Sequence, residues 1–323
     1  MRYLYRRNKN GICIDRIFGY DEIIEIPETL EGLPVTELGA YIFSDHIDRK
    51  ELEALKAKGS FCTEDGQEVT DDGGEPEISG NTVKELYFPV HLNKIGRYAF
   101  YNCFYLNKLS FYGELRDIGA GALTGCHKIN RISVKADEKG ESCLRELLTE
   151  LPETLRVDME INGVKGRFWF PEFFEEGIEN TPARILGNRV HGSGLRYRNS
   201  IVHKKLHTLE YDRLFSCAVV LEKEQIVLNL AMDRILYPAE LTEESEETYI
   251  AYLKEHGVAA IQILGEQQEY EAMTLILQKI APERADVEQM LETAQNSGDS
   301  RWVSILMDRL QSHGKKKRKA FEL

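Results

Sequence analysis

The feature that most constrains the fold is an internal repeat of 23 residues in the first half of the chain. Segments 95–103 and 118–126 both read Ile-Gly-x-x-Ala-x-x-x-Cys, and a more distant copy covers 38–46. The same 23-residue offset holds upstream for three sets of apolar residues: Val83, Leu106 and Ile129; Leu86, Leu109 and Ile132; Phe88, Phe111 and Val134. Self-similarity at a fixed period is typical of repeats that stack on one another.

Each repeat contains a short strand pattern. Residues 86–88, 109–111 and 132–134 alternate apolar, polar and apolar, which is the period of a strand with one buried face. Because one coil cannot bury its own apolar face, neighbouring coils must stack. We therefore expect parallel coils that build a continuous sheet.

The best copy, residues 88–106, reads Phe-Pro-x-x-Leu-x-x-Ile-Gly-x-x-Ala-Phe-x-x-Cys-x-x-Leu. This pattern resembles the BspA-type leucine-rich repeat, and residues 26–39 resemble the way such arrays begin. The resemblance covers about residues 10–135. It implies a short leucine-rich-repeat solenoid in a bacterial protein; family members are often secreted. An unrelated β-rich domain is the alternative.

The repeat also places two cysteines. Cys103 and Cys126 occupy the same repeat position, which His46 takes in the first copy. We interpret them as small buried residues; a metal site formed by these three residues is the alternative. None of the six cysteines forms a Cys-x-x-Cys pair, and the N-terminus lacks the apolar segment of a secretion signal, so reduced thiols are expected.

An insertion at 47–82 interrupts the array. Its first part, 48–58, is rich in helix formers and is followed by Gly59. Residues 59–82 carry seven acidic side chains and no basic ones, which predicts a solvated, flexible loop. An acidic partner-binding arm is the alternative.

After the array we expect a helix at 142–151 and strands at 155–161 and 164–170. Asn162 and Gly163 between the strands are a strong signal for a type I′ hairpin turn. We interpret this hairpin as a cap on the exposed end of the array, which completes a domain of residues 1–171.

A basic, irregular connector is predicted at 172–208. The Arg184–Arg198 stretch combines glycines with arginines and a histidine, and backbone amides with guanidinium groups can hold phosphate or carboxylate. The candidate binding residues there are Arg189, His191, Arg196, Tyr197 and Arg198. Pairing of these arginines with acidic groups of the same chain is the alternative.

The rest of the chain has helical periodicity. A helical-repeat domain is predicted at 209–314, with helices at 211–222, 225–236, 245–256, 269–280, 285–295 and 301–312. The segment loosely resembles ankyrin repeats but lacks the Thr-Pro-Leu-His motif, so a HEAT-like or unique helical bundle stays open. A basic, disordered tail is expected at 315–323.

The sequence thus predicts an α+β chain, and its composition limits the function. A net charge of −13 makes nucleic acid an unlikely partner. The apolar runs are too short for a membrane span, which needs about 20 residues. With no export signal, we expect a cytoplasmic protein that does not bind membranes.

No catalytic triad, phosphate loop or metal-binding motif is found, so we expect neither an enzyme, a cofactor nor a metal. The favoured interpretation is a non-catalytic scaffold that binds another protein. Two surfaces are candidates: the Arg184–Arg198 stretch, which we favour slightly, and the outward strand residues around Tyr87 and Tyr112. An enzyme or anion-binding protein with its site in Arg184–Arg198 is the alternative.

Overall fold

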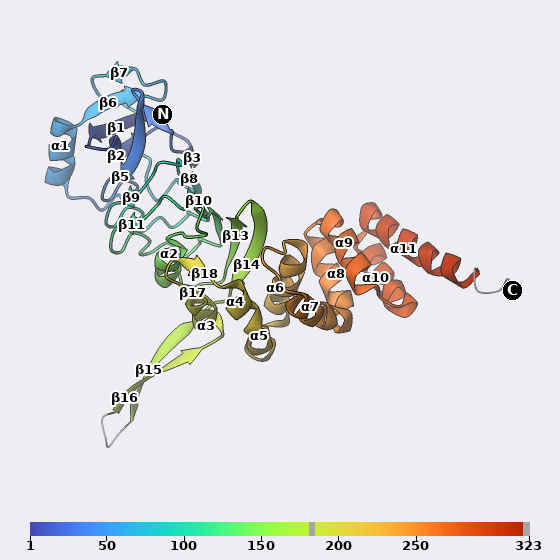
Figure 1. Cartoon of the computed structure of the whole chain (residues 1–323). Coiled ribbons are helices and arrows are strands. Elements are labelled where there is room, and N and C mark those ends of the chain that lie inside the picture. Colours follow the sequence, from blue (N-terminus) through green and yellow to red (C-terminus); the bar gives the residue numbers. More distant parts are fainter. Residues whose placement is uncertain (181–184, 319–323) are drawn as a thin grey trace. The chain divides into compact units, whose positions relative to one another are not determined.

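The computed structural model describes residues 1–180 and 185–318 and divides into two compact units (Figure 1). The first unit comprises 1–165 and 170–207, and the second comprises 166–169 together with the chain from Thr208 onward. The first is rich in strands and the second in helices, so the α+β expectation holds. Along the chain, the assignment changes within β14 (Val164–Phe170) and again between His207 and Thr208.

The N-terminal strands form one sheet of the first unit. Strands β1 (Arg2–Arg7) and β2 (Ile12–Phe18) make an antiparallel hairpin, and β2 is completely buried. The strand order is β11 (Asp117–Ile118), β9 (Lys94–Ile95), β5 (Leu33–Leu38), β2, β1, β6 (Ser60–Thr63) and β7 (Glu68–Val69), with β4 (Thr29–Leu30) paired to β5. The short strands β9 and β11 therefore join this sheet to the repeats.

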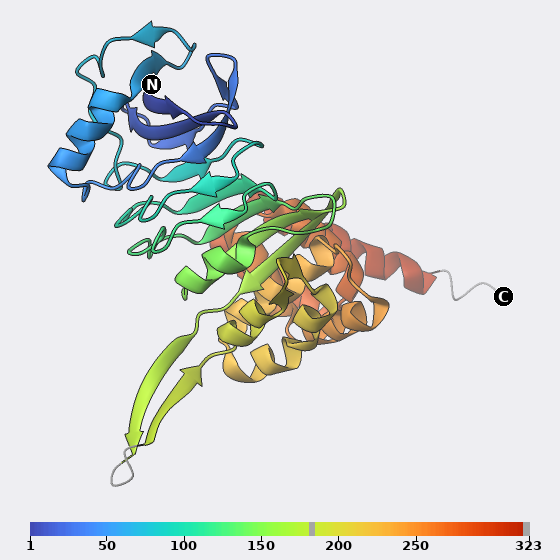
Figure 2. The ribbon, with the colours of Figure 1, turned by 60° about the vertical axis from the view of Figure 1, so that its left-hand side comes forward.

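The repeats build a second sheet by parallel pairing (Figure 2). Its neighbouring strands are β3 (Ile23–Glu25), β8 (Glu85–Tyr87), β10 (Lys108–Tyr112), β12 (Arg131–Lys135) and β13 (Leu155–Ile161). Leu109 pairs with Leu86 on one side and with Ile132 on the other, and all three are fully buried. The register between these strands equals the sequence repeat, so like residues stack on like residues.

Aromatic rings fill the interior of the coils. Phe100 is fully buried and stacks on Phe43 and Phe88, with ring centroids 5.8 and 5.9 Å away. The backbone N–H of Phe43 donates to the carbonyl of Ala99 at 2.9 Å. The copy at 38–46 therefore stacks directly on the copy at 95–103, although the insertion separates them in sequence.

The cysteines at the repeat position are packing residues. Cys103 and Cys126 are free thiols and buried, and the Cys126 thiol donates to the carbonyl of Phe100 at 3.0 Å. A hydrogen bond with the Cys126 thiol, together with burial, raises the pKa of Cys103 well above its usual value. His46 contacts Asp45, with Nδ1 2.6 Å from Oδ1, and its ring packs edge-on against Tyr101.

The expectation of a flexible loop at 59–82 was wrong. Helix α1 (Arg49–Lys58) forms as predicted, capped by the Asp48 side chain, but β6 then pairs with β1 and β7 pairs with β6. Phe61 packs with Leu4 and Phe18 in a small core. The high number of acidic residues favoured a loop even though the segment also contains these apolar residues. Several of its carboxylates form ion pairs with Arg2 and Lys56.

The expectation of an irregular connector at 172–208 was also wrong. After the predicted helix, which is α2 (Leu144–Glu150), the segment contains five regular elements: β15 (Phe174–Asn180), β16 (Ile185–His191), α3 (Gly194–Asn199), β17 (Ile201–Val202) and β18 (Lys205–Leu206). β15 and β16 form a two-stranded antiparallel hairpin. Short strands with interspersed glycines lack the apolar periodicity that would have revealed them.

Arg198 fixes this segment onto the array. Its buried guanidinium donates to five backbone carbonyls, with donor–acceptor distances between 2.6 and 3.2 Å: those of Leu148, Leu151, Glu153, Pro171 and Gly194. Burial lowers the pKa of Arg198 to about 10. The planar fork of donors is what lets one side chain satisfy carbonyls from three separate chain segments.

The second unit consists of eight helices among its described residues. They are α4 (Thr208–Arg213), α5 (Phe215–Leu221), α6 (Glu224–Leu236), α7 (Glu243–Glu255), α8 (Gly257–Glu266), α9 (Tyr270–Ile280), α10 (Arg284–Ser297) and α11 (Ser300–Arg318). A buried ion pair lies at its centre: Arg234 Nε is 2.8 Å from Asp212 Oδ1, and the Tyr249 hydroxyl donates to the same oxygen.

Three helix predictions differ from the structure. The single helix expected at 211–222 is two helices, α4 and α5, with Leu214 between them. Helix α8 was missed because Gly257 was interpreted only as a turn, whereas it begins a new helix directly after α7. The tail was expected to be disordered from Lys315, but α11 continues through Gly314 to Arg318; the remainder of the predicted tail lies outside the described residues. Across the described ranges, none of the helices has the length and apolar character that crossing a bilayer requires.

Replacing Phe100 with alanine should destabilise the first unit by about 3–5 kcal/mol, because the ring is enclosed between two other aromatic rings. Thermal unfolding monitored by circular dichroism measures the effect. Phe104→Ala is the matched control, since that ring in the same coil is 48% exposed. Equal midpoints for the two variants would show that the repeat interior is assigned wrongly.

Arg198→Lys should lower the free energy of unfolding by about 3 kcal/mol, because a lysine cannot reach all five carbonyls and leaves buried acceptors unpaired. Urea unfolding measures the loss, with Arg189→Lys on the exposed side of β16 as the control. A loss below about 0.5 kcal/mol would contradict the structural role given to this guanidinium.

Candidate binding surfaces

The residues predicted within Arg184–Arg198 do not form one exposed site. Tyr197 and Arg198 are buried in α3, so they cannot contact a partner from the surface. Arg196 is exposed on the same helix, whereas Arg189 and His191 belong to β16. Arg184 lies outside the described residues.

An acidic residue of the same chain, Glu176, lies beside the two members of this set that belong to β16. His191 Nε2 lies 3.0 Å from Glu176 Oε2, and its ring stacks on Phe174 at 4.8 Å. Arg189 is the cross-strand neighbour of Glu176 in the β15–β16 hairpin. These positions give no support to an enzyme or anion site in this stretch.

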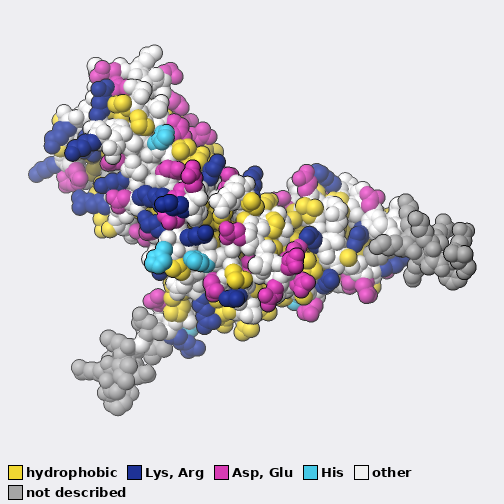
Figure 3. Space-filling model, viewed as in Figure 1, with side chains coloured by type: hydrophobic (Ala, Val, Ile, Leu, Met, Phe, Trp, Pro, Cys, Tyr) yellow, Lys and Arg dark blue, Asp and Glu magenta, His cyan; other side chains and the backbone are white. Residues whose placement is uncertain are grey.

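The second candidate is the outward face of the parallel sheet, which we call the sheet face. Its side chains come from alternate positions of β8, β10, β12 and β13 and are mostly polar: Glu85, Tyr87, Lys108, Ser110, Tyr112, Arg131, Ser133, Lys135, Arg156, Asp158 and Glu160. The register places these residues in rows across the strands. Figure 3 likewise shows basic and acidic side chains interspersed over the surface in view.

Tyr87 is held in place on the sheet face by its neighbours. The Tyr87 hydroxyl donates to Glu85 Oε2 and accepts from Lys108 Nζ, both at 2.6 Å, and Lys108 Nζ lies 4.7 Å from the ring centroid. The hydrogen bond from Tyr87 lowers the pKa of Glu85, and the bond to Tyr87 raises the pKa of Lys108. The tyrosine is thus a rigid, half-buried residue between two fixed charges.

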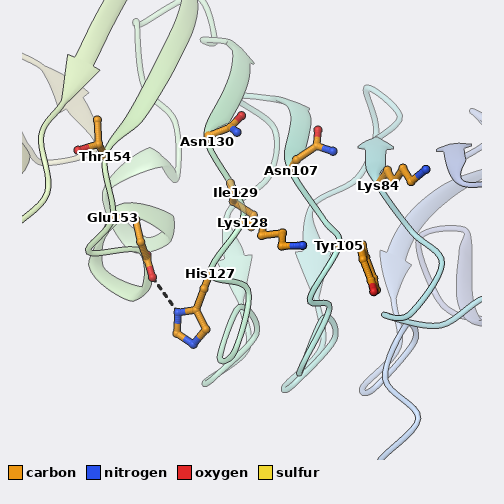
Figure 4. Close-up of a pocket in the computed structure, with 9 residues that line it drawn as sticks. All are labelled: Lys84, Tyr105, Asn107, His127, Lys128, Ile129, Asn130, Glu153 and Thr154. Carbon is orange, nitrogen blue, oxygen red and sulfur yellow. Dashed lines mark hydrogen bonds and ion pairs between the residues drawn. The ribbon is translucent and has the colours of Figure 1, made fainter. Parts of the chain in front are cut away.

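A groove of about 400 Å³ lies beside the sheet face, at the N-terminal ends of its strands (Figure 4). One side is formed by Lys84, Asn107, Asn130 and Thr154, and the other by Tyr105, Lys128, His127 and Glu153, with Ile129 at the bottom. Asn107 and Asn130 come from neighbouring coils and point the same way (Figure 4). The groove therefore crosses successive coils.

Sequence reasoning missed this groove, although the repeat contained the signal. Lys84, Asn107 and Asn130 are spaced by 23 residues, so the parallel register necessarily brings them together. The alternating pattern of each strand indicates its buried apolar positions and its outward positions. The polar residue just before each strand lies outside that pattern.

A smaller groove of about 210 Å³ lies within the helical unit. His256 Nδ1 is 2.8 Å from Glu224 Oε1, and Tyr252 stacks on the imidazole at 4.2 Å. The other charged lining residues are Lys254, Glu255 and Asp286. Its one histidine is already paired, so this groove offers weaker chemistry than the one in the first unit.

Comparison with solved structures found two leucine-rich-repeat proteins. A leucine rich cell surface protein from Faecalibacterium prausnitzii A2-165 is 17% identical, with 44% of this chain and 32% of that chain covered and a TM-score of 0.26. The Treponema protein described as T. pallidum Leucine Rich Repeat protein is 19% identical, with 41% and 68% covered and a TM-score of 0.18. The chain thus spans about a third of the first of these proteins, and likenesses of this extent define neither fold nor function.

No curated protein matches the chain. The ankyrin-like interpretation of the helical unit stays a prediction. Within the first unit, residues 79–148 match the family model described as the BspA type leucine rich repeat region, which confirms the resemblance of the array over that segment.

Proposed function

We propose that the chain is a non-catalytic protein-binding scaffold whose sheet face contacts another protein. Leucine-rich-repeat proteins generally mediate protein–protein interaction, and residues 79–148 match such a repeat. The main support for the proposal is that each strand alternates buried apolar side chains with outward, mostly polar ones. Leu86, Leu109 and Ile132 supply the core, so the outward residues that alternate with buried ones along each strand are available for recognition.

The composition of the sheet face supports contact with a protein. Tyr87 and Tyr112 offer large side chains with a polar tip, a type enriched at interaction hot spots. The hydrogen bonds that hold Tyr87 reduce the conformational entropy that a partner's binding would remove. Lys135 and Glu160, an ion pair at 3.5 Å, lie in the row of Tyr112 and add charge beside it.

We infer that the sheet face, rather than the arginine stretch, is the contact surface. Because Tyr197 and Arg198 are buried, only Arg189, His191 and Arg196 remain accessible there. They lie on two different elements, a strand and a helix. These three residues form the competing surface.

The test is capture of partners from extracts of the native cell, quantified by mass spectrometry. Tyr87→Ala combined with Tyr112→Ala should reduce the captured partner at least tenfold, because two hot-spot tyrosines each contribute about 2 kcal/mol or more. Arg189→Glu combined with Arg196→Glu should leave capture unchanged. Tyr20→Ala is the matched control, since that ring is 79% exposed and Tyr20 belongs to none of the strands of the sheet face.

All variants must first show the unfolding midpoint of the parent protein. If partners survive the tyrosine pair and disappear with the arginine pair, binding belongs to the α3 and β16 surface. If neither pair changes capture, the sheet face is not the contact surface.

A further inference from the structure

The groove beside the sheet face has the length and direction of a short extended chain. Its upper side is built by Lys84, Asn107, Asn130 and Thr154, which come from successive coils (Figure 4). At a strand spacing of about 4.8 Å, four coils span roughly 14 Å, and an extended peptide covers that distance with about four residues. A segment lying along the array would therefore contact every coil in turn.

The two asparagines are suited to bind a peptide main chain. Their backbone N–H groups are used within the array: Asn107 donates to the Lys84 carbonyl at 2.8 Å and Asn130 to the Asn107 carbonyl at 3.1 Å. Their side-chain amides have no hydrogen-bond partner among the described residues. Each amide offers both donors and an acceptor, which complements the N–H and C=O of a peptide group.

Charge favours an acidic ligand at one end of the groove. Lys128 Nζ lies 4.6 Å from the Tyr105 ring centroid, and no carboxylate pairs with it in the described part of the chain. Lys84 pairs with Glu22, and both of these side chains are about half exposed, so that pair contributes little. Two lysines thus face the groove in a protein whose net charge is −13.

The opposite end is closed to acidic groups and is fixed in position. His127 Nδ1 lies 2.7 Å from Glu153 Oε1, and the Glu153 carboxylate would repel a second carboxylate (Figure 4). The backbone at Glu153 is anchored, because its carbonyl accepts from Arg198 Nη2 at 2.9 Å. Arg198 is therefore a positioning residue for this end of the groove.

From these features we propose that the groove binds an extended peptide segment of a protein partner, with an acidic side chain placed between Lys84 and Lys128. The asparagine amides bind the main chain, and the Tyr105 ring, 47% exposed, contacts the stem of a neighbouring side chain. The proposal rests on the proposed function, because it names the part of a partner protein that the array recognises. An oligosaccharide could also use Tyr105 and the amides, but it would not need the two lysines.

The test uses the full chain and fluorescence polarisation with short labelled peptides. One peptide alternates glutamate with threonine, which favours an extended chain, and a second replaces glutamate with lysine. The glutamate peptide should bind with an affinity that falls as salt rises, and the lysine peptide should not bind. Lys128→Glu should weaken binding at least tenfold, whereas Lys165→Glu, on the exposed start of β14, should leave it unchanged.

Asn107→Ala combined with Asn130→Ala should also weaken the glutamate peptide about tenfold, with the same salt dependence as the parent protein. The proposal is overturned if the glutamate peptide does not bind at millimolar concentration, if the lysine peptide binds equally well, or if Lys128→Glu has no effect. Binding of a cello-oligosaccharide that the asparagine pair abolishes and Lys128→Glu does not would assign the groove to carbohydrate.

The outcome is separable from that of the proposed function. Loss of partner capture with the tyrosine pair, together with no peptide binding, would reject the groove and keep the sheet face. Peptide binding that depends on Lys128, with capture unaffected by the tyrosine pair, would keep the groove and reject the sheet face.

Discussion

Parallel stacking at a constant register is the constraint on which the rest of the first unit depends. Leu86, Leu109 and Ile132 lie side by side because each coil repeats the last with the same number of residues between strands. One insertion or deletion within a coil would move a polar residue into this row of buried apolar residues. The array tolerates the 36 residues of the insertion because they lie between two coils and not within one. Phe43 therefore still stacks on Phe100.

The same register creates the polar surfaces. Asn107 and Asn130 are neighbours for the same reason that their buried counterparts are, and so are Lys108 and Arg131 on the sheet face. A repeat array therefore converts a one-dimensional pattern into a row of matching side chains. Recognition of an extended segment is a natural use of such a row, since both ligand and surface advance by a regular step.

Much of the fold follows from the sequence. The 23-residue period identified the coils, Asn162 and Gly163 identified the turn before β14, and the helical periodicity located most of the second unit. The predictions were wrong where the local composition favours one structure and the tertiary contacts favour another. Phe61 and Cys62 form a strand within an acidic segment because β1 offers them a free edge, which no local pattern can reveal.

Function was less predictable than fold. Arg198 was proposed as a binding residue because arginines among glycines can hold anions, yet its guanidinium is occupied by five backbone carbonyls. A sequence shows that such a side chain is present but not which acceptors surround it. The groove was missed for the opposite reason, since its residues, such as Lys84 and Thr154, are ordinary until the register brings them together.

The register itself can be measured by engineered disulfides on the sheet face. Ser110 and Ser133 are direct neighbours across β10 and β12, so Ser110→Cys with Ser133→Cys should form a disulfide under mild oxidation, because a Cα separation of about 5 Å lies within its range. Ser110→Cys with Lys135→Cys is one row out of register, at roughly 8 Å, and should stay reduced. Peptide mapping by mass spectrometry distinguishes the two. Cross-linking of the second pair in preference to the first would contradict the register from which both surfaces are derived.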